Sequence, residues 1–281
     1  MKYLKYIITL FLIAVVTIVW IYYDKKNISI VSNEAGCDRK LTYAWTGLSE
    51  PFILGSAKAP SGIDIEILNS ALKIVDCEAV IEDLNTLSWK RNLSLLSIGK
   101  IDLTLQASFS KEREKYANFS SPYRSEYIAI FIRSEDLKYE KFKISKIEDL
   151  SKYDFLLGVG LSNIYGPKVD GVIERMGSKI KRNKTVVKNR KALQAKLIDG
   201  YISYIPTELI KIKKNKLEDK IKILPNSIVK TGDVHLMLSK ASTSETTLKK
   251  INNGIEKIKE NGTYDLIMNH YSKQYQLPSV K

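Results

Sequence analysis

Histidine and cysteine are scarce in this sequence, which has only His235, His270, Cys37 and Cys77. Neither cysteine has another cysteine or a histidine at the spacing of a zinc motif, so a metal site is the least favoured role for them. The sequence also lacks a Gly-x-Ser-x-Gly motif, and the two histidines have no catalytic partner nearby in sequence. Nucleophilic catalysis therefore finds no support, and we expect no metal.

Motifs that bind phosphates are missing as well. There is no Walker-type loop, and Gly158-Val159-Gly160 is only half of a dinucleotide fingerprint, because Asn163 stands where its third glycine would be. These gaps exclude nucleotide binding, and we expect no cofactor.

The sequence contains no low-complexity tract and no internal repeat. Its 281 residues are 44% hydrophobic and 27% charged, the composition of a globular protein long enough for two lobes. The net charge of +14 comes from scattered lysines rather than from a basic run with interleaved aromatics. This pattern favours a lysine-rich soluble surface over nucleic-acid binding.

One long hydrophobic run is present, from Tyr6 to Tyr23, preceded by Lys2 and Lys5. It is just long enough to cross a bilayer core of about 30 Å, and no small-x-small cleavage site follows it. A lipoprotein site at Cys37 is excluded because the apolar residue that should precede it is missing. The pattern predicts a segment over residues 1–26 that anchors the chain at the extracytoplasmic face of the membrane, with export and cleavage as the alternative.

The location of Cys37 and Cys77 bears on their role. Both follow the predicted export segment, and a disulfide is the leading interpretation in an exported chain. Two unrelated buried thiols are the alternative.

Strand and helix patterns alternate from residue 38 onward, which predicts an α/β protein. We expect strands at residues 41–44, 79–81, 101–107, 127–132, 155–159, 201–205, 221–224 and 235–238, with a further candidate at Val186. Helices are predicted over residues 65–75, 89–98, 165–176, 192–199 and 248–261, and from Pro206 onward. The charged stretch 133–143 is interpreted as a crossing between lobes.

The segment Ser108-Phe109-Ser110-Lys111-Glu112-Arg113 directly follows a predicted strand. It places hydroxyl groups and a guanidinium at the strand's carboxyl end, where open α/β sheets bind ligands. Since Arg can hold a carboxylate through two charge-assisted hydrogen bonds, the segment predicts a carboxylate site.

Several motifs together resemble the family 3 periplasmic solute-binding proteins of the polar-amino-acid ABC-transporter type. The motifs are Gly62-Ile63-Asp64-Ile65-Glu66, Gly99-Lys100-Ile101-Asp102, the segment from Ser110 to Ala117, Phe119-Ser120-Ser121-Pro122-Tyr123 and Gly262-Thr263-Tyr264. Trp89-Lys90-Arg91 and Pro122-Tyr123-Arg124 resemble a divergent branch of that family. The likeness spans roughly residues 38 to 275.

The resemblance implies a type II periplasmic-binding-protein fold, with two lobes of mixed sheet joined by a two-strand hinge. Lobe 1 would comprise residues 37–134 and 227–281, and lobe 2 residues 135–226. A ligand carboxylate would be bound by Arg113, assisted by Ser108. The other implied contacts are aromatic walls from Trp45, Phe52, Trp89 and Tyr123, and an acid for the ligand's amino group at Glu208.

Two positions depart from the family pattern. Ser162-Asn163 stands where the second lobe usually offers Gly-Thr, although both residues can cap a helix and leave its amides free for an anion. Ser203 replaces a common aspartate, which argues against a standard amino acid as ligand.

Each implied residue has a structural alternative. Arg113 could be a surface arginine paired with a neighbouring glutamate, Trp45 and Trp89 could be core residues, and Glu208 could have a purely structural role.

The leading functional hypothesis is an extracytoplasmic binding protein that captures a small polar, carboxylate-bearing ligand for an ABC-type permease or a sensor. The alternative is a periplasmic enzyme on the same fold, such as a dehydratase of cyclic carboxylates, with Glu50, Glu208 or His235 as general acid. A sensory module of a larger signalling protein is disfavoured because no output domain follows.

Overall fold

The computed structural model describes residues 36–82, 87–161, 163 and 165–275. The predicted anchor, Tyr6 to Tyr23, lies outside these residues. Within the described part of the chain, no helix is both long and apolar enough to span a bilayer. Contacts divide the chain into two units, Met1–Asp38 and Arg39–Lys281.

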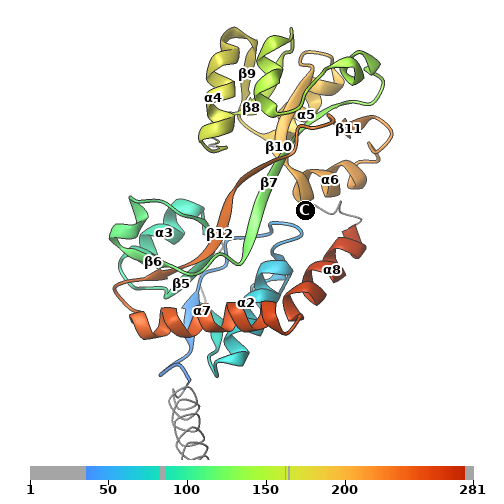
Figure 1. The fold of residues 1–281 in the computed structure, drawn as a ribbon. Coiled ribbons are helices and arrows are strands. Elements are labelled where there is room, and N and C mark those ends of the chain that lie inside the picture. Colours follow the sequence, from blue (N-terminus) through green and yellow to red (C-terminus); the bar gives the residue numbers. More distant parts are fainter. Residues whose placement is uncertain (1–35, 83–86, 162, 164, 276–281) are drawn as a thin grey trace, which may run out of the picture. The chain divides into compact units, whose positions relative to one another are not determined.

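An eight-stranded mixed sheet organises the described residues from Arg39 onward (Figure 1). Its main path runs β5-β12-β7-β10-β8-β9, with β6 paired to β12 and β11 paired to β7. The strand bounds are β5 Leu103–Ser108, β6 Ala117–Phe119, β7 Arg124–Arg133, β8 Leu157–Gly160, β9 Ile180–Asn183, β10 Gly200–Tyr204, β11 Ile221–Ile223 and β12 Val229–Ser239.

Strands β7 and β12 are the long elements of this sheet and pair antiparallel with each other. Figure 1 shows them linking two groups of elements, which we call lobe 1 and lobe 2. One end of β12 pairs with β5 and β6 of lobe 1, whereas the later part of β7 pairs with β10 and β11 of lobe 2. The two-strand connection implied by the resemblance is therefore present.

The apolar stretch of β7 is buried on both faces. Because side chains alternate across a strand, Ile128, Ile130 and Ile132 enter one hydrophobic cluster, and Ala129 and Phe131 enter another. This double burial explains why the segment is apolar without alternation, and it makes β7 the centre of lobe 2.

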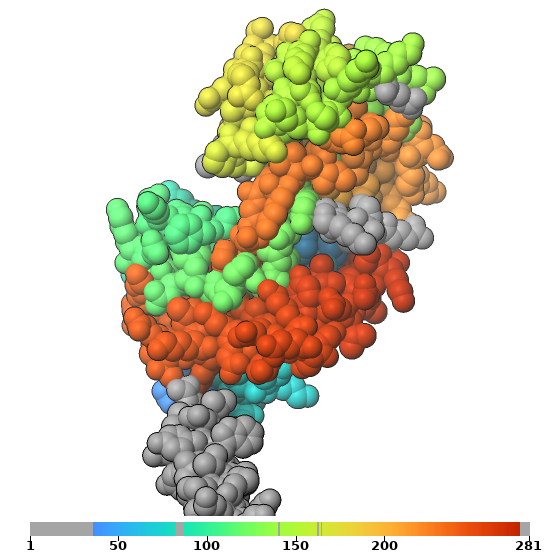
Figure 2. All heavy atoms as spheres, in the orientation of Figure 1, coloured from blue at the N-terminus to red at the C-terminus, as the bar shows by residue number. Residues whose placement is uncertain are grey.

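Among its described residues, lobe 1 contains two further small sheets and four α-helices. The parallel pair is β1 Leu41–Tyr43 with β4 Ala79–Ile81, and the antiparallel pair is β2 Leu54–Ser56 with β3 Ala59–Ser61. The helices are α2 Ile63–Ile74, α3 Trp89–Ser97, α7 Glu245–Glu260 and α8 Thr263–Tyr275. Figure 2 shows α7 and α8 covering one face of this lobe.

Helices α2 and α7 pack backbone to backbone at Gly254. A Cβ atom added there would lie 2.3 Å from the carbonyl oxygen of Ala71. We expect Gly254→Ala to lower the free energy of unfolding by about 1–3 kcal/mol, because the two helices must move apart. Denaturant unfolding measures the change.

Gly171 provides the matched control, since it also lies inside a helix but a Cβ there would meet only the end of Arg175 at 3.6 Å. Gly171→Ala should be neutral or stabilise by about 0.5–1 kcal/mol through helix propensity. A Gly254→Ala variant as stable as Gly171→Ala would contradict the close packing.

The α-helices described in lobe 2 are α4 Pro167–Met176, α5 Val186–Gln194 and α6 Ile205–Lys214. Proline lies in the first turn of both α4 and α6, where its missing N–H costs no hydrogen bond. The hydroxyl of Thr185 caps α5 by accepting a hydrogen bond from the backbone N–H of Lys188, 3.2 Å away.

Three local predictions differ from the structure. Val186 begins helix α5 rather than a strand, because Thr185 caps the helix there. That helix ends at Gln194, so the predicted helix over 192–199 is wrong. The stretch 133–143 does not cross between lobes. It forms a 3₁₀ turn at Leu137–Lys141, and Tyr139 is buried in a lobe 2 cluster.

The lobe boundaries remain a prediction, because contacts leave Arg39–Lys281 as one unit. The predicted disulfide is confirmed: Cys37 and Cys77 are the two cysteines of the chain, and both are disulfide-bonded.

Candidate functional site

A cavity of about 830 Å³ lies where segments of both lobes meet strands β7 and β12. We call it the Arg113 cavity, and Figure 2 shows the surface hollowed between the segment after β5 and the start of α4. Its lining is Ser108, Phe109, Ser110, Glu112, Arg113, Glu126, Asn163, Tyr165, Gly166, Pro167, Tyr204, Thr231, Gly232, Asp233 and His235.

The lobe 1 wall carries the predicted carboxylate site. Ser108 ends β5, and the chain turns so that Arg113 begins a 3₁₀ turn and donates from Nη1 to the Ser108 carbonyl oxygen, 3.2 Å away. The guanidinium carbon also lies 5.6 Å from the ring centroid of Trp89, which is 37% exposed. Arg113 is thus positioned by two contacts and still reaches the cavity.

The lobe 2 wall is the start of helix α4 and the turn before it. The hydroxyl of Tyr165 accepts hydrogen bonds from the Gly160 backbone N–H at 2.9 Å and from Asn163 Nδ2 at 3.2 Å. A Cβ on Gly160 would lie 2.5 Å from Cγ of Asn163, so a larger residue there would displace the Asn163 amide. The N-terminus of α4 faces the cavity beside Asn163 and favours an anion there.

The base of the cavity is formed by the linking strands. Glu126 lies on β7 opposite Gly232 of β12, at an irregularity in the strand register. Asp233 forms a 2.6 Å ion pair with Lys230 and accepts a hydrogen bond from Ser125. The contact with Lys230 and the hydrogen bond from Ser125 together lower the pKa of the Asp233 carboxyl.

A second cavity, of about 380 Å³, shares Glu126 and Tyr204 with the first. We call it the Arg124 cavity. Its lining is Phe52, Ile63, Arg124, Ser125, Glu126, Tyr127, Tyr204, Ile205, Pro206, Tyr264, Met268, Asn269 and Ser272.

Arg124 is held rigidly at the wall of this second cavity. Its Nε and Nη2 donate to the two carboxylate oxygens of Asp64 at 2.7 and 3.1 Å, and its guanidinium lies 3.8 Å from the Phe52 ring centroid. Burial alone would lower the pKa of Arg124, but the charge of Asp64, its hydrogen bonds and the neighbouring Tyr123 and Glu126 together outweigh burial and raise that pKa. Arg124 therefore stays charged and paired.

Not every predicted ligand residue lies at a cavity. The structure brings Ser108, Arg113 and Asn163 together, with Trp89 against Arg113. Phe52 lines the Arg124 cavity instead, and Ser162 lies outside the described residues.

Trp45 and Tyr123 are core residues, 8% and 1% exposed. The Tyr123 hydroxyl accepts a hydrogen bond from the backbone N–H of Gln106, and burial raises its pKa. Glu208 is 1% exposed and is bound by Arg190, Tyr201 and Ser203 inside lobe 2. These positions do not support the ligand-binding roles predicted for Trp45, Tyr123 and Glu208.

Glu126 and Tyr204 line both cavities and were not predicted from the sequence. The one sequence signal for Glu126 is its place as a carboxylate just before the apolar stretch of β7. Tyr204 ends β10 immediately before α6, which places it at a strand's carboxyl end.

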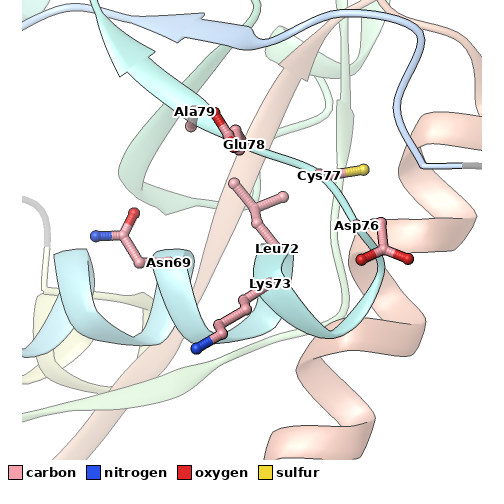
Figure 3. Close-up of a pocket in the computed structure, with 7 residues that line it drawn as sticks. All are labelled: Asn69, Leu72, Lys73, Asp76, Cys77, Glu78 and Ala79. Carbon is pink, nitrogen blue, oxygen red and sulfur yellow. The ribbon is translucent and has the colours of Figure 1, made fainter.

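A third cavity, of about 450 Å³, lies at the C-terminal end of α2, and none of the predicted ligand residues lines it (Figure 3). Its lining is Asn69, Leu72, Lys73, Asp76, Cys77, Glu78 and Ala79. The figure shows Asn69 and Lys73 side by side along α2, with Asp76 on the other side of the chain.

The candidates for general acid chemistry have other partners. Glu50 forms an ion pair with Lys214, and Nδ1 of His235 lies 2.6 Å from the Ser120 carbonyl oxygen. His235 does line the Arg113 cavity. Among the described residues, no group of three or more His, Cys, Asp or Glu side chains is arranged to hold a metal ion.

Comparison with known proteins identifies the family. The model of the bacterial extracellular solute-binding proteins, family 3, matches residues 41–274, and the chain belongs to this family. This confirms the resemblance inferred from the motifs. The search of curated protein sequences found no match.

Solved structures confirm the type II periplasmic-binding fold. Substrate-binding domain 2 of Lactococcus lactis GlnP, in an open conformation, is 20% identical with a TM-score of 0.66 and covers 89% of this chain and 100% of its own. The second substrate-binding domain of a putative amino acid ABC transporter from Streptococcus pneumoniae is 21% identical, with a TM-score of 0.63 and coverage of 83% and 99%. An arginine transport-system periplasmic binding protein from Legionella pneumophila is 18% identical, with a TM-score of 0.59 and coverage of 83% and 99%.

Proposed function

We propose that this protein captures a small, polar, carboxylate-bearing ligand, an amino acid or a derivative, and passes it to an ABC-type permease or a sensor. The observation that carries the proposal is the convergence of Ser108 and Arg113 with Asn163 and the start of α4 on one cavity. A guanidinium, a hydroxyl and the positive end of a helix dipole together match a carboxylate.

The position of the site favours capture by closure. Its walls come from both lobes, so a ligand bound by both would hold them together, as in hinge closure around ligands. Recognition of this kind needs no covalent chemistry, and the family consists of binding proteins. Amino acids are named as ligands of several structural neighbours, which supports the same ligand class here.

An anchor over residues 6–23 would serve this function. Tethering the binding lobes beside a membrane partner raises their local concentration there. The family's extracellular character supports a location outside the cytoplasmic membrane.

The Arg113→Ala variant tests the carboxylate site. We would screen the full-length protein in mild detergent by thermal shift against the twenty amino acids and small carboxylates, since ligand binding raises the midpoint. Removing the guanidinium should weaken the best ligand by about 1.5–3 kcal/mol, the range for a charged hydrogen bond.

Lys115→Ala is the matched control, because Lys115 is an exposed base two residues away that does not line the cavity. It should leave affinity within about threefold, well under the tenfold change that 1.4 kcal/mol represents. Equal affinity in Arg113→Ala and the wild type would count against this site, and a ligand that is consumed would favour an enzyme.

A further inference from the structure

Glu126 occupies the junction between the two cavities. It lines both of them, as Tyr204 does, so a ligand in the Arg113 cavity that extends toward the Arg124 cavity passes this carboxylate. Its side chain is 23% exposed, which leaves it open to the cavities but largely out of bulk water.

The charges around Glu126 do not balance. Two carboxylates, Asp64 and Glu126, both form ion pairs with Arg124. Arg124 donates two hydrogen bonds to Asp64, at 2.7 and 3.1 Å, whereas its contact with Glu126 is 3.5 Å long. The cluster of these three residues therefore carries one excess negative charge at a cavity wall, where such a charge is costly unless it is paired.

The groups around this charge suit a cation. Phe52, Tyr204 and Tyr264 place aromatic rings in the lining of the Arg124 cavity, and aromatic faces attract cations. Burial raises the pKa of Glu126, as expected for a carboxylate short of solvent and countercharge. Gly232, opposite Glu126, leaves open space, since a Cβ there would meet nothing within 4 Å.

The other carboxylates of the Arg113 cavity are less suited. Asp233 is already neutralised by Lys230 at 2.6 Å, and Glu112 is exposed to solvent. Glu208, the acid expected to bind an amino group, is enclosed in lobe 2.

We propose that Glu126 binds a positively charged group of the ligand, an ammonium or guanidinium, while Arg113 binds its carboxylate. This inference rests on the proposed function and narrows its ligand class to zwitterionic or cationic molecules. Glu126 is then the residue that selects them over plain carboxylates.

The test compares ligands with and without a cation on Glu126→Gln, which keeps the shape of the side chain and removes its charge. Full-length wild type and variant are titrated by calorimetry with the tightest amino acid of the twenty, with its N-acetyl derivative and with glutarate. We expect Glu126→Gln to weaken the amino acid at least tenfold and to leave glutarate unchanged or tighter. The acetylated ligand should behave like glutarate where the α-ammonium is the only cation of the amino acid, and like the amino acid where a side-chain cation remains. Retained glutarate binding would also show that the variant is folded.

Asp233→Asn is the matched control, a second carboxylate of the same cavity that already has a lysine partner, and it should change affinity less than threefold. Equal weakening of ligands with and without a cation by Glu126→Gln would overturn the inference, as would a wild type that binds only cation-free carboxylates. In both cases the proposed function stands.

A wild type that binds no probe at all would instead contradict the proposed function and the inference with it. Should Glu126→Gln lose glutarate as well, Glu126→Asp, which keeps the charge, must recover selectivity for the amino acid, and its failure to do so would overturn the inference.

Discussion

Replacing Asp64 by alanine is expected to lower the free energy of unfolding by about 3–5 kcal/mol, the cost of breaking a buried ion pair from one side. Asp64 is 0% exposed and forms both hydrogen bonds of a bidentate pair with Arg124. Without it, the guanidinium of Arg124 is left in the interior with Glu126 at 3.5 Å as its remaining carboxylate contact among the described residues. The stabilisation lost is therefore mainly that of the two hydrogen bonds to Asp64, because the long contact with Glu126 compensates the buried guanidinium poorly.

Denaturant unfolding of the full-length protein measures this loss. Glu260→Ala is the control, because its pair with Lys257 is exposed on α7 and such pairs contribute less than about 1 kcal/mol.

The double variant Asp64→Leu with Arg124→Met distinguishes the contribution of charge to stability from that of packing. Since apolar replacement of a buried pair is often neutral or stabilising, it should recover most of the loss. An Asp64→Ala variant as stable as Glu260→Ala would show that Arg124 finds another partner.

The helices and strands with strong local signals could be predicted from the sequence. The stripe Ile65, Leu68 and Leu72 is buried in α2, and the continuous apolar run in β7 is buried on both faces. Errors arose where the local signal was weak. The start of α5 depends on the Thr185 cap, and its first turns carry no apolar stripe.

The residues of the candidate site could also be predicted only where the local sequence signal is strong. Ser108 and Arg113 follow a strand whose end was predicted, and strand ends in α/β sheets position ligand residues. Aromatic type alone could not tell Trp45 and Tyr123, which are buried, from Trp89, which is exposed. Glu126 depends on pairing between β7 and β12, strands about a hundred residues apart, and local sequence holds no record of such pairing.

The second large effect on stability is expected at Glu208. Substituting this residue distinguishes a structural role from a ligand-binding role. Its two oxygens accept hydrogen bonds from Nε and Nη2 of Arg190 at 2.7 and 3.0 Å, and Tyr201 and Ser203 also donate to it. Burial, followed by the charge of Glu208, raises the pKa of the Tyr201 hydroxyl, so that hydroxyl remains a donor. The carboxylate thus joins α6 to α5 and β10 in the core of lobe 2.

Glu208→Ala should therefore cost about 3–5 kcal/mol of stability, because it strands the Arg190 guanidinium in the interior. Ligand affinity of the folded protein should change less than threefold, since Glu208 lines neither the Arg113 nor the Arg124 cavity. Unfolding and calorimetry on the same preparation measure both quantities, with Glu218→Ala, an exposed glutamate after α6, as control. A small stability loss with a large affinity loss would place Glu208 at the ligand, as the resemblance implied. The reverse result would leave Glu126 as the carboxylate best positioned for a ligand cation.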